Sequence, residues 1–394
     1  MVIGAFLHKD SVMNICIITS SFPSRPDDVI QAPFLIDFIE GLQKRDHQVF
    51  LFTQDRKGIK EEFLEGVQVK WFPWMKSTKA LAQLNPMNPS DCLRIGSLFR
   101  NGRKALLPFV KEKKIDVCLA LWVLPSGYFA NLAYRWAGIP YSVWALGSDI
   151  YRYGRNSFLY PILKRIIKEA RGVFADGFDL SKRVEERFGR DCFFLATTRT
   201  LKKIIPPEPN KPNEPNNPFC FLFVGRLERV KGVDLLLQSM AWLMEEYLEI
   251  HLTIVGKGSM EEWAKVFIHQ KGMEKRVSMV GNVSDPVLAS LYISADCIVI
   301  PSRSESIPLV FSEAIRFDKE LIVTNVGDMG RLGRQYGVAW VVPPEDPMAL
   351  KEMMKKRVER KDNGTKGGNK AGRDELERLF NIETSVERFL ADYK

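Results

Sequence analysis

Short apolar runs alternate with amphipathic segments along most of the chain. The first run, residues 14–19, is apolar and β-branched and predicts a strand. Residues 33–45 follow with apolar positions at helical spacing, and the run at 49–53 predicts a second strand. The chain therefore opens β-α-β. Further strands are expected at 67–72, 117–121, 141–146 and 172–175, separated by helical stretches such as 93–113 and 161–170.

A segment rich in proline and asparagine interrupts this alternation at residues 205–218. It holds six prolines and four asparagines, which leave no apolar face and cannot continue a helix. We predict that it is a linker between domains. Beyond it the alternation restarts, with strands expected at 219–224, 252–255, 277–280 and 297–300 and helices at 233–247 and 260–270.

The repeated alternation indicates parallel sheets covered by helices on both faces. At 394 residues the chain exceeds the size at which one core stops growing. We therefore predict an α/β protein of two Rossmann-like, doubly wound parallel-sheet domains that face a central cleft, over residues 1–204 and 219–374. The Gly-rich stretch 361–373 predicts a loop, and a last helix over 375–394 is expected to cross back to the N-terminal domain.

Positive charge is concentrated in the first half of the chain. Of the net charge of +9, residues up to Pro218 contribute 32 Lys and Arg against 22 Asp and Glu, whereas the rest contribute 25 against 26. The basic half suits an anionic partner such as a membrane surface, and the alternative is an ordinary solvated surface. Within 152–171, basic and aromatic side chains interleave, which fits either a bilayer contact or a packed helix with a solvated face. A nucleic-acid partner is disfavoured because the charge is spread without an aromatic–basic motif.

Cysteine spacing and hydropathy indicate a cytoplasmic protein, at most peripheral on the cytoplasmic face of a membrane. The six cysteines lie far apart without a C-x-x-C pair, so neither a disulfide framework nor a zinc site is expected. Residues 1–13 lack the pattern of a signal peptide. The uncharged run 117–134 is interrupted by Pro125 and Gly127 and predicts strand, loop and buried helix rather than a membrane span.

Open parallel sheets bind ligands outside the carboxyl ends of their strands, so the loops after strands are the candidate site. After the strand at 219–224, Arg226 lies just past the strand end and Lys231 lies at the start of the next helix. Two cations at a helix N-terminus suit a diphosphate. A glycine turn at Gly256 and Gly258 follows the next strand, and alone it is a weak signal.

The loop after the strand at 297–300 carries two glutamates. Pro308 suits the first turn of a helix and Ser306 is expected to cap it, so free amides near 307–310 would face an anion. Glu305 lies before this helix and could bind sugar hydroxyls, whereas Glu313 lies more than one turn into it and could bind a ribose. Two glutamates eight residues apart are common on solvated surfaces, but the position of Glu305 and Glu313 after a buried strand favours a ligand-binding site.

These motifs resemble those of the family-four retaining glycosyltransferases of the GT-B fold, the group 1 glycosyltransferases. The matching features are the G-R-L-x-x-x-K-G loop at 225–232, the glycine turn at Gly256 and Gly258, and the E-x7-E signature from Glu305 to Glu313. The first half is similar more loosely, at 32–35, 122–127 and 146–149. The resemblance covers residues 13–350 and implies transfer of a hexose, with retention, from a nucleoside-diphosphate sugar to a glycan or lipid-linked acceptor of the cell envelope.

The resemblance also assigns residue roles. It implies that Arg226 and Lys231 neutralise the donor diphosphate, Glu305 contacts the transferred sugar and Glu313 holds the ribose. Fixed cations would then act where leaving-group charge develops, so neither a metal nor a cofactor is expected. Further donor contacts are implied at Gly256, Gly258, Gly281, Ser306, Ile307, Pro308 and Leu309, and acceptor-side contacts at Asp149 and Trp122.

Departures from the family pattern keep other interpretations open. Leu121 and Leu146 stand where the family often has histidines, which excludes acid–base work by imidazoles there. Asp149 is then either an acceptor-side carboxylate or a helix cap. Residues 20–24 replace the usual glycine-rich first loop and leave that diphosphate contact in doubt. The alternatives are a sugar-nucleotide epimerase or phosphorylase of the same architecture, and a nucleotide-sugar-binding scaffold without turnover, which the intact second-domain motifs disfavour.

Overall fold

The computed structural model describes residues 12–22, 32–55, 64–75, 81, 84, 85, 87–147, 149–153, 158–201, 218–362 and 369–393. The chain forms two compact units. The N-terminal unit comprises residues 1–199 together with 382–394, and the C-terminal unit comprises 200–381. The predicted linker at 205–218 lies outside the described residues except for Pro218.

The N-terminal unit is built on a seven-stranded sheet in the order β3-β2-β1-β4-β5-β6-β7, with every neighbouring pair parallel. Its central strands are buried on both faces, which explains why they read as continuous apolar runs rather than as alternating ones. The strands are β1 (Asn14–Ile18), β2 (Gln48–Gln54), β3 (Gln68–Phe72), β4 (Val117–Leu121), β5 (Tyr141–Ala145), β6 (Gly172–Ala175) and β7 (Phe193–Phe194).

Helices cover this sheet, and a short π-helical turn (Asp149–Tyr153) follows β5. The longest helix, α2, begins at Pro89, where the Asn88 side chain accepts a hydrogen bond from the Asp91 amide at 3.2 Å and caps the first turn. The neighbouring α3 packs against it. The helices are α1 (Phe34–Gln43), α2 (Pro89–Glu112), α3 (Ser126–Ala137), α4 (Tyr160–Glu169), α5 (Phe178–Phe188) and α13 (Ile382–Ala391).

The C-terminal unit has a parallel six-stranded sheet in the order β10-β9-β8-β11-β12-β13. Counted within the unit this is 3-2-1-4-5-6, the Rossmann order, in which the winding direction reverses between the first and fourth strands. The strands are β8 (Phe219–Val224), β9 (Ile250–Val255), β10 (Val277–Gly281), β11 (Cys297–Ile300), β12 (Glu320–Thr324) and β13 (Ala339–Val342). The two parallel sheets flanked by helices confirm the predicted α/β class.

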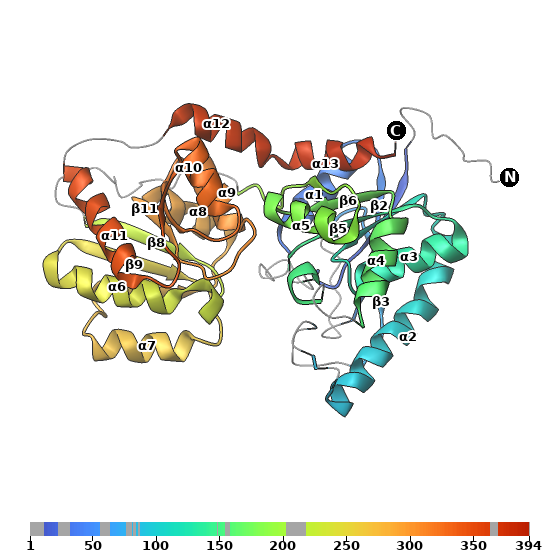
Figure 1. Ribbon diagram of the computed structural model, residues 1–394, viewed down its shortest axis with the longest axis horizontal. Coiled ribbons are helices and arrows are strands. Elements are labelled where there is room, and N and C mark those ends of the chain that lie inside the picture. Colours follow the sequence, from blue (N-terminus) through green and yellow to red (C-terminus); the bar gives the residue numbers. More distant parts are fainter. Residues whose placement is uncertain are drawn as a thin grey trace. The chain divides into compact units, whose positions relative to one another are not determined.

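The helices of the C-terminal unit follow the strands in alternation (Figure 1). An apolar core forms between the sheet and α6, with Leu236, Met240 and Leu243 fully buried. The helices are α6 (Val233–Glu246), α7 (Glu261–Gln270), α8 (Asp285–Ser294), α9 (Leu309–Arg316), α10 (Met329–Tyr336), α11 (Pro347–Asp362) and α12 (Lys370–Leu379).

The end of the chain differs from the single helix expected at 375–394. Two helices, α12 and α13, occupy this region, and α12 begins at Lys370, inside the stretch 361–373 that was expected to be a loop. The Asn369 side chain accepts a hydrogen bond from the Gly372 amide at 3.2 Å and caps α12. The helix α12 packs on α9 in the C-terminal unit, whereas α13 packs on α1 in the N-terminal unit.

The helix α13 completes one face of the N-terminal sheet, where it lies along α1 (Figure 1). The rings of Phe389 and Phe38 are 5.9 Å apart, and Phe38 also contacts the buried Trp144 of β5. The hydroxyl groups of Tyr393 and Ser142 share a buried hydrogen bond of 2.6 Å. Residues 382–393 are therefore part of the N-terminal core although they come last in the chain.

None of the helices in the described part of the chain combines the length and the apolar character needed to cross a bilayer.

Candidate functional site

The carboxyl ends of β8 and β11 lie next to each other at the point where the C-terminal sheet reverses its winding. The loop after β8 and the loop after β11 touch through their backbones, since the Arg303 amide donates to the Val230 carbonyl at 2.8 Å. Gly232 has φ of +75°, and a Cβ there would lie 2.0 Å from the Pro301 carbonyl oxygen. Only glycine permits this approach, which brings the two predicted site loops together.

Lys231 and Glu305, which are 74 residues apart in sequence, form an ion pair at this junction. Their side chains are 20% and 13% exposed, so the pair is partly shielded from water but reachable. The Ser302 hydroxyl donates to the same Glu305 oxygen at 3.3 Å. The sequence predicted that both residues belong to the site, but it did not predict their pairing. An anionic ligand that reached this junction would meet an ammonium and a carboxylate side by side.

Arg303 is a site residue that the sequence reasoning missed. Its guanidinium forms two hydrogen bonds with Asp234, at 2.7 and 2.8 Å, and a third with Glu345 at 2.6 Å. These carboxylates, Asp234 above all, raise the pKa of Arg303. A charged residue between two serines in a loop is normally solvated, so the sequence around Arg303 gave no indication that it links two loops of the site. Arg303 ties the loop that carries Glu305 to the helix that follows Lys231.

The predicted glycine turn packs against the loop after β8. Gly256 has φ of +129°, and a Cβ there would lie 1.9 Å from the Gly225 carbonyl oxygen. A Cβ on Gly258 would lie 2.4 Å from the Leu227 carbonyl oxygen. The Gly256 amide donates to the Gly281 carbonyl at 2.7 Å, so three consecutive post-strand loops share one backbone network. The two glycines are required by this packing, and their contact with a donor stays a prediction.

Glu313 is buried on α9, with 2% of its surface exposed. Its carboxylate accepts a hydrogen bond of 2.7 Å from the Tyr292 hydroxyl of α8. Tyr292 is itself fully buried and stacks on Phe317 at 5.1 Å between ring centroids. This packing fixes the carboxylate, and its contact with a ribose stays a prediction.

Ser306 does not cap α9, contrary to the expectation from the sequence. The helix begins at Leu309 and the capping position is taken by Pro308, whose ψ of 149° leaves Ser306 two residues outside. The Ser306 hydroxyl is buried and has no hydrogen-bond partner within the described chain. A Cβ on Gly327 would lie 2.1 Å from the Glu305 carbonyl oxygen. The backbone after β12 therefore packs directly against the loop that carries Glu305.

The remaining predicted donor residues lie at or after the ends of β8, β10 and β11. Arg226 follows β8, is exposed, and makes no ion pair with any residue that the structure describes. Ile307 is buried and Leu309 opens α9, while Gly281 ends β10 with φ of +67°. The structure thus places all predicted donor-side residues after strands of one unit, and their individual roles stay predictions.

Asp149, one of the two predicted acceptor-side residues, lies inside the N-terminal unit with its side chain fully buried. Its carboxylate accepts hydrogen bonds from the Val123 amide at 2.7 Å and the Ile150 amide at 3.1 Å. It therefore joins the loop after β4 to the turn after β5, and burial raises its pKa to about 6. Trp122, the other residue, is half-buried beside this link with φ of +68°. Their contact with an acceptor stays a prediction.

We expect the Asp149 carboxyl to make the folded protein less stable as pH rises from 4 to 7. The folded protein holds this proton up to a pKa of about 6, whereas an unfolded aspartate loses it near pH 4. The stabilising contribution is therefore present below about pH 4 and is lost as pH rises through about 6. The shift corresponds to about 3 kcal/mol in the free energy of unfolding.

The measurement is urea unfolding of the wild type and Asp149→Asn at several pH values. The variant should lack the downward component between pH 4 and 7, while the exposed Asp191→Asn should retain it. Parallel profiles for wild type and Asp149→Asn would show that this carboxyl is not held protonated by burial.

The described residues contain no group of three or more His, Cys, Asp and Glu side chains placed to hold a metal ion. The expectation that catalysis requires no metal stays a prediction.

Comparisons with known proteins agree with this geometry. Residues 205–372 match a family model described as glycosyl transferases group 1, and residues 30–176 match one described as glycosyl transferase 4-like. A putative teichuronic acid biosynthesis glycosyltransferase, TuaC, from Bacillus subtilis is 28% identical over 258 residues, 63% of each chain. The chain spans less than two thirds of the length of this and other leading curated relatives.

Two solved structures share the fold over nearly the whole chain. Sucrose-phosphate synthase from Thermosynechococcus elongatus superposes with a TM-score of 0.77 at 18% identity and covers 97% of this chain and 98% of its own. The Anabaena protein HepE, in complex with UDP and glucose, has a TM-score of 0.71 at 16% identity and covers 96% and 98%. At such identities the likeness shows a shared architecture.

Proposed function

The chain belongs to the group 1 glycosyltransferases, and from that premise we propose that it transfers a hexose, with retention of configuration, from a nucleoside-diphosphate sugar to a glycan or lipid-linked acceptor. The observation that carries the proposal is the ion pair of Lys231 and Glu305 where the C-terminal sheet reverses its winding. Open α/β sheets bind their ligands at that place. In this pair, Lys231 supplies a cation for the diphosphate, and Glu305 next to it supplies a carboxylate that can bind sugar hydroxyls.

The chemistry follows from the charges that develop as the glycosidic bond breaks. The diphosphate gains negative charge while the sugar becomes oxocarbenium-like. Lys231 and Arg226 would stabilise the negative charge on the diphosphate. Glu305 would hold the oxocarbenium-like sugar and stabilise its positive charge. Because Lys231 is already positioned by Glu305, little reorganisation is needed when the donor binds. Two protein cations supply the charge that a leaving diphosphate requires, so we expect turnover without added metal.

The rest of the donor would be held by α9 and the loop before it. The buried Ser306 hydroxyl, without a partner in the described chain, is a donor available to a phosphate or sugar oxygen. Free amides at the start of α9 favour the same negative charge. Glu313, held by Tyr292, would accept from ribose hydroxyls. Residues near Gly281 would contact the base.

The relatives suggest where the donor and acceptor should be sought first. HepE was solved with UDP and with UDP-glucose, which makes uridine nucleotides the first donors to test. The name of TuaC refers to teichuronic acid synthesis, and we propose cell-envelope polysaccharide or glycolipid as the acceptor class. A cytoplasmic enzyme that contacts an anionic membrane surface through its basic N-terminal half would fit such acceptors.

Two observations favour a second candidate function, a nucleotide-sugar-binding scaffold without turnover. Leucines occupy positions 121 and 146, and the carboxylate of Asp149 is already bonded to two backbone amides. The N-terminal unit then offers fewer groups for acceptor chemistry. Both candidate functions include binding of the nucleotide-sugar donor, but only the first includes transfer of its sugar to an acceptor.

We expect isothermal titration with a panel of nucleoside diphosphates and their sugars, without metal, to reveal selective binding of one nucleotide. Binding should weaken in Lys231→Ala, because the diphosphate loses its cation, and should be unchanged in Lys271→Ala, an exposed lysine at the far end of α7. Binding without hydrolysis or transfer to any acceptor would favour the scaffold. Absence of binding across the panel would contradict both candidates.

A further inference from the structure

A groove with a basic rim lies between α2 and α3 of the N-terminal unit. It has a volume of about 670 Å³. Its lining combines cations with aromatic and aliphatic side chains, chiefly Arg100, Arg103, Lys104, Leu107, Tyr128 and Trp136. The roles proposed for the donor and acceptor do not use any of these residues.

The apolar part of the groove is formed by rings that stay accessible. Trp136 is 51% exposed at the end of α3, and Tyr128 packs edge-on against Phe99 with ring centroids 5.0 Å apart. Contiguous apolar surface that stays exposed marks sites of contact with proteins or membranes. Tryptophan and tyrosine, with an apolar body and a polar tip, are enriched where proteins meet the bilayer interface.

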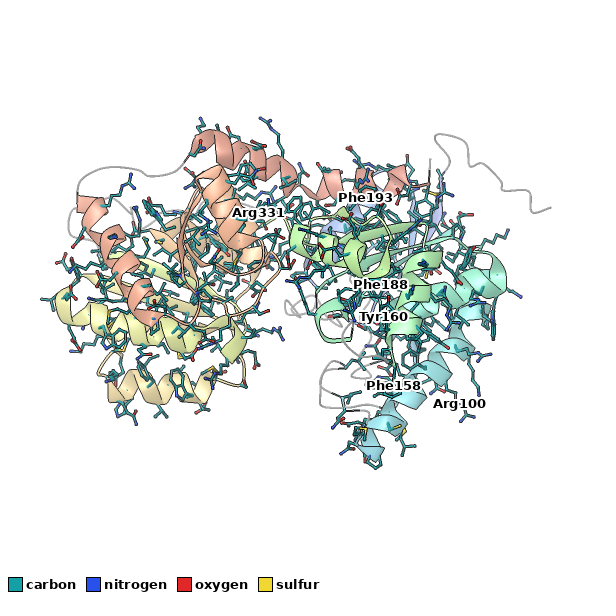
Figure 2. All side chains as sticks on the ribbon, in the orientation of Figure 1. Arg100, Phe158, Tyr160, Phe188, Phe193 and Arg331 are labelled. Carbon is teal, nitrogen blue, oxygen red and sulfur yellow. The ribbon has the colours of Figure 1, made fainter. Side chains whose placement is uncertain are left out.

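The lining of the groove contains cations and no acidic side chain among the residues that the structure describes. Arg100, Arg103 and Lys104 are exposed, and none forms an ion pair with a residue that the structure describes. The guanidinium of Arg103 lies 4.3 Å from the centre of the Trp136 ring, so charge and aromatic surface are combined at one point. Arg100 projects from α2 toward the outside of the unit (Figure 2). Among the described residues, this surface is therefore positive and its three cations are not compensated by ion pairs.

The same composition extends along the outward stripe of α2. Helical periodicity puts Leu93, Arg100, Lys104, Leu107 and Lys111 on one side, because they are spaced by three, four or seven residues. Leu93 is 64% exposed. The two acidic residues of α2 are paired elsewhere, Asp91 with Arg94 and Glu112 with Lys113. A stripe that mixes leucine with unpaired cations matches an anionic lipid surface in both charge and polarity.

We propose that the groove between α2 and α3 binds the phosphate headgroups of anionic phospholipids and thereby docks the N-terminal unit on an anionic bilayer. The inference rests on the proposed membrane contact and gives it a location. It moves that contact away from the segment 152–171, in which the ring of Tyr160 is stacked on Phe188 at 5.6 Å within the unit. Figure 2 labels both side chains. The basic residues of α4 then form a solvated face.

The test is co-sedimentation with phosphatidylcholine vesicles, with and without about 40% phosphatidylglycerol, at about 0.1 M salt, where surface charges act over about 10 Å. The full chain should bind only the anionic vesicles. In the triple variant Arg100→Ala, Arg103→Ala, Lys104→Ala, partitioning should fall on the order of 100-fold, because each cation near such a surface contributes a factor of about five. These residues are exposed, so the variant should unfold at the wild-type temperature.

The matched control removes the same charge from α4, through Lys164→Ala, Arg165→Ala and Lys168→Ala. It should keep binding within a few-fold of wild type. Equal losses in both triple variants would mean a non-specific charge effect and would overturn the proposal, as would absence of binding by wild type. Full competition by inorganic phosphate at millimolar concentration would identify a site for free phosphate instead. Nucleotide titration of the same variants should be unchanged, which separates this outcome from failure of the donor site.

Discussion

Replacement of Glu305 by glutamine is expected to lower the rate of sugar transfer by about 10² to 10³-fold. The amide keeps the size of the side chain and can still accept from the Ser302 hydroxyl, but it no longer carries the charge that faces Lys231 and the developing oxocarbenium ion. Lys231→Ala should abolish transfer, because the leaving diphosphate loses a fixed cation. The measurement is single-turnover transfer with the donor identified by titration.

The two variants should differ in donor affinity. Lys231→Ala removes a ligand of the diphosphate and should weaken nucleotide binding, whereas Glu305→Gln frees Lys231 from its partner and should leave the affinity for the nucleoside diphosphate equal or higher. Circular dichroism should show both variants folded. Wild-type transfer rates in both would reject the assignment of this ion pair to the reaction.

Gly256→Ala is expected to destabilise the C-terminal unit by several kcal/mol and to abolish nucleotide binding. The added Cβ would lie 1.9 Å from the Gly225 carbonyl oxygen, at a φ of +129° that other residues rarely adopt. Relief requires the loops after β8 and β9 to separate, and the first of them carries Arg226 and Lys231. Urea unfolding followed by tryptophan fluorescence measures the change in stability.

Gly272→Ala is the matched control for this substitution. Gly272 also has a positive φ, +62°, but an added Cβ would have no neighbour within 4 Å. The control should therefore cost only about 1 to 2 kcal/mol, the strain of a left-handed backbone. Similar unfolding midpoints for the two variants would show that the loops after β8 and β9 are not held as closely as the geometry indicates.

The fold was largely predictable because the strands of a buried parallel sheet are short, apolar and regularly spaced. Residues 297–300, for example, were expected as a strand and form β11 with the same bounds. Strand order was not readable in that way. Which loops meet depends on which strands are neighbours, and the pairing of β8 with β11 brings Lys231 to Glu305 across 74 residues of sequence.

The predictions that were wrong concern local competition between residues. Ser306 is a good capping residue by type, but Pro308 fixes where α9 begins and takes the position itself. The charged, Gly-rich stretch 361–373 looked like a loop because charged residues dominate it, yet Asn369 caps a helix from Lys370 onward. For Asp149 the sequence left two roles open, since burial of a carboxylate depends on the surrounding fold.

The discontinuity of the N-terminal unit has a consequence for the order in which the protein folds during synthesis. The first two hundred residues emerge from the ribosome well before α13, yet α1 needs α13 to cover Phe38, and Gly41 provides the space that Val386 fills. Until residues 382–393 have been translated, that apolar face remains open to water. The N-terminal unit thus reaches its final stability only after the C-terminal unit has been made, which couples completion of the first domain to translation of the last helix.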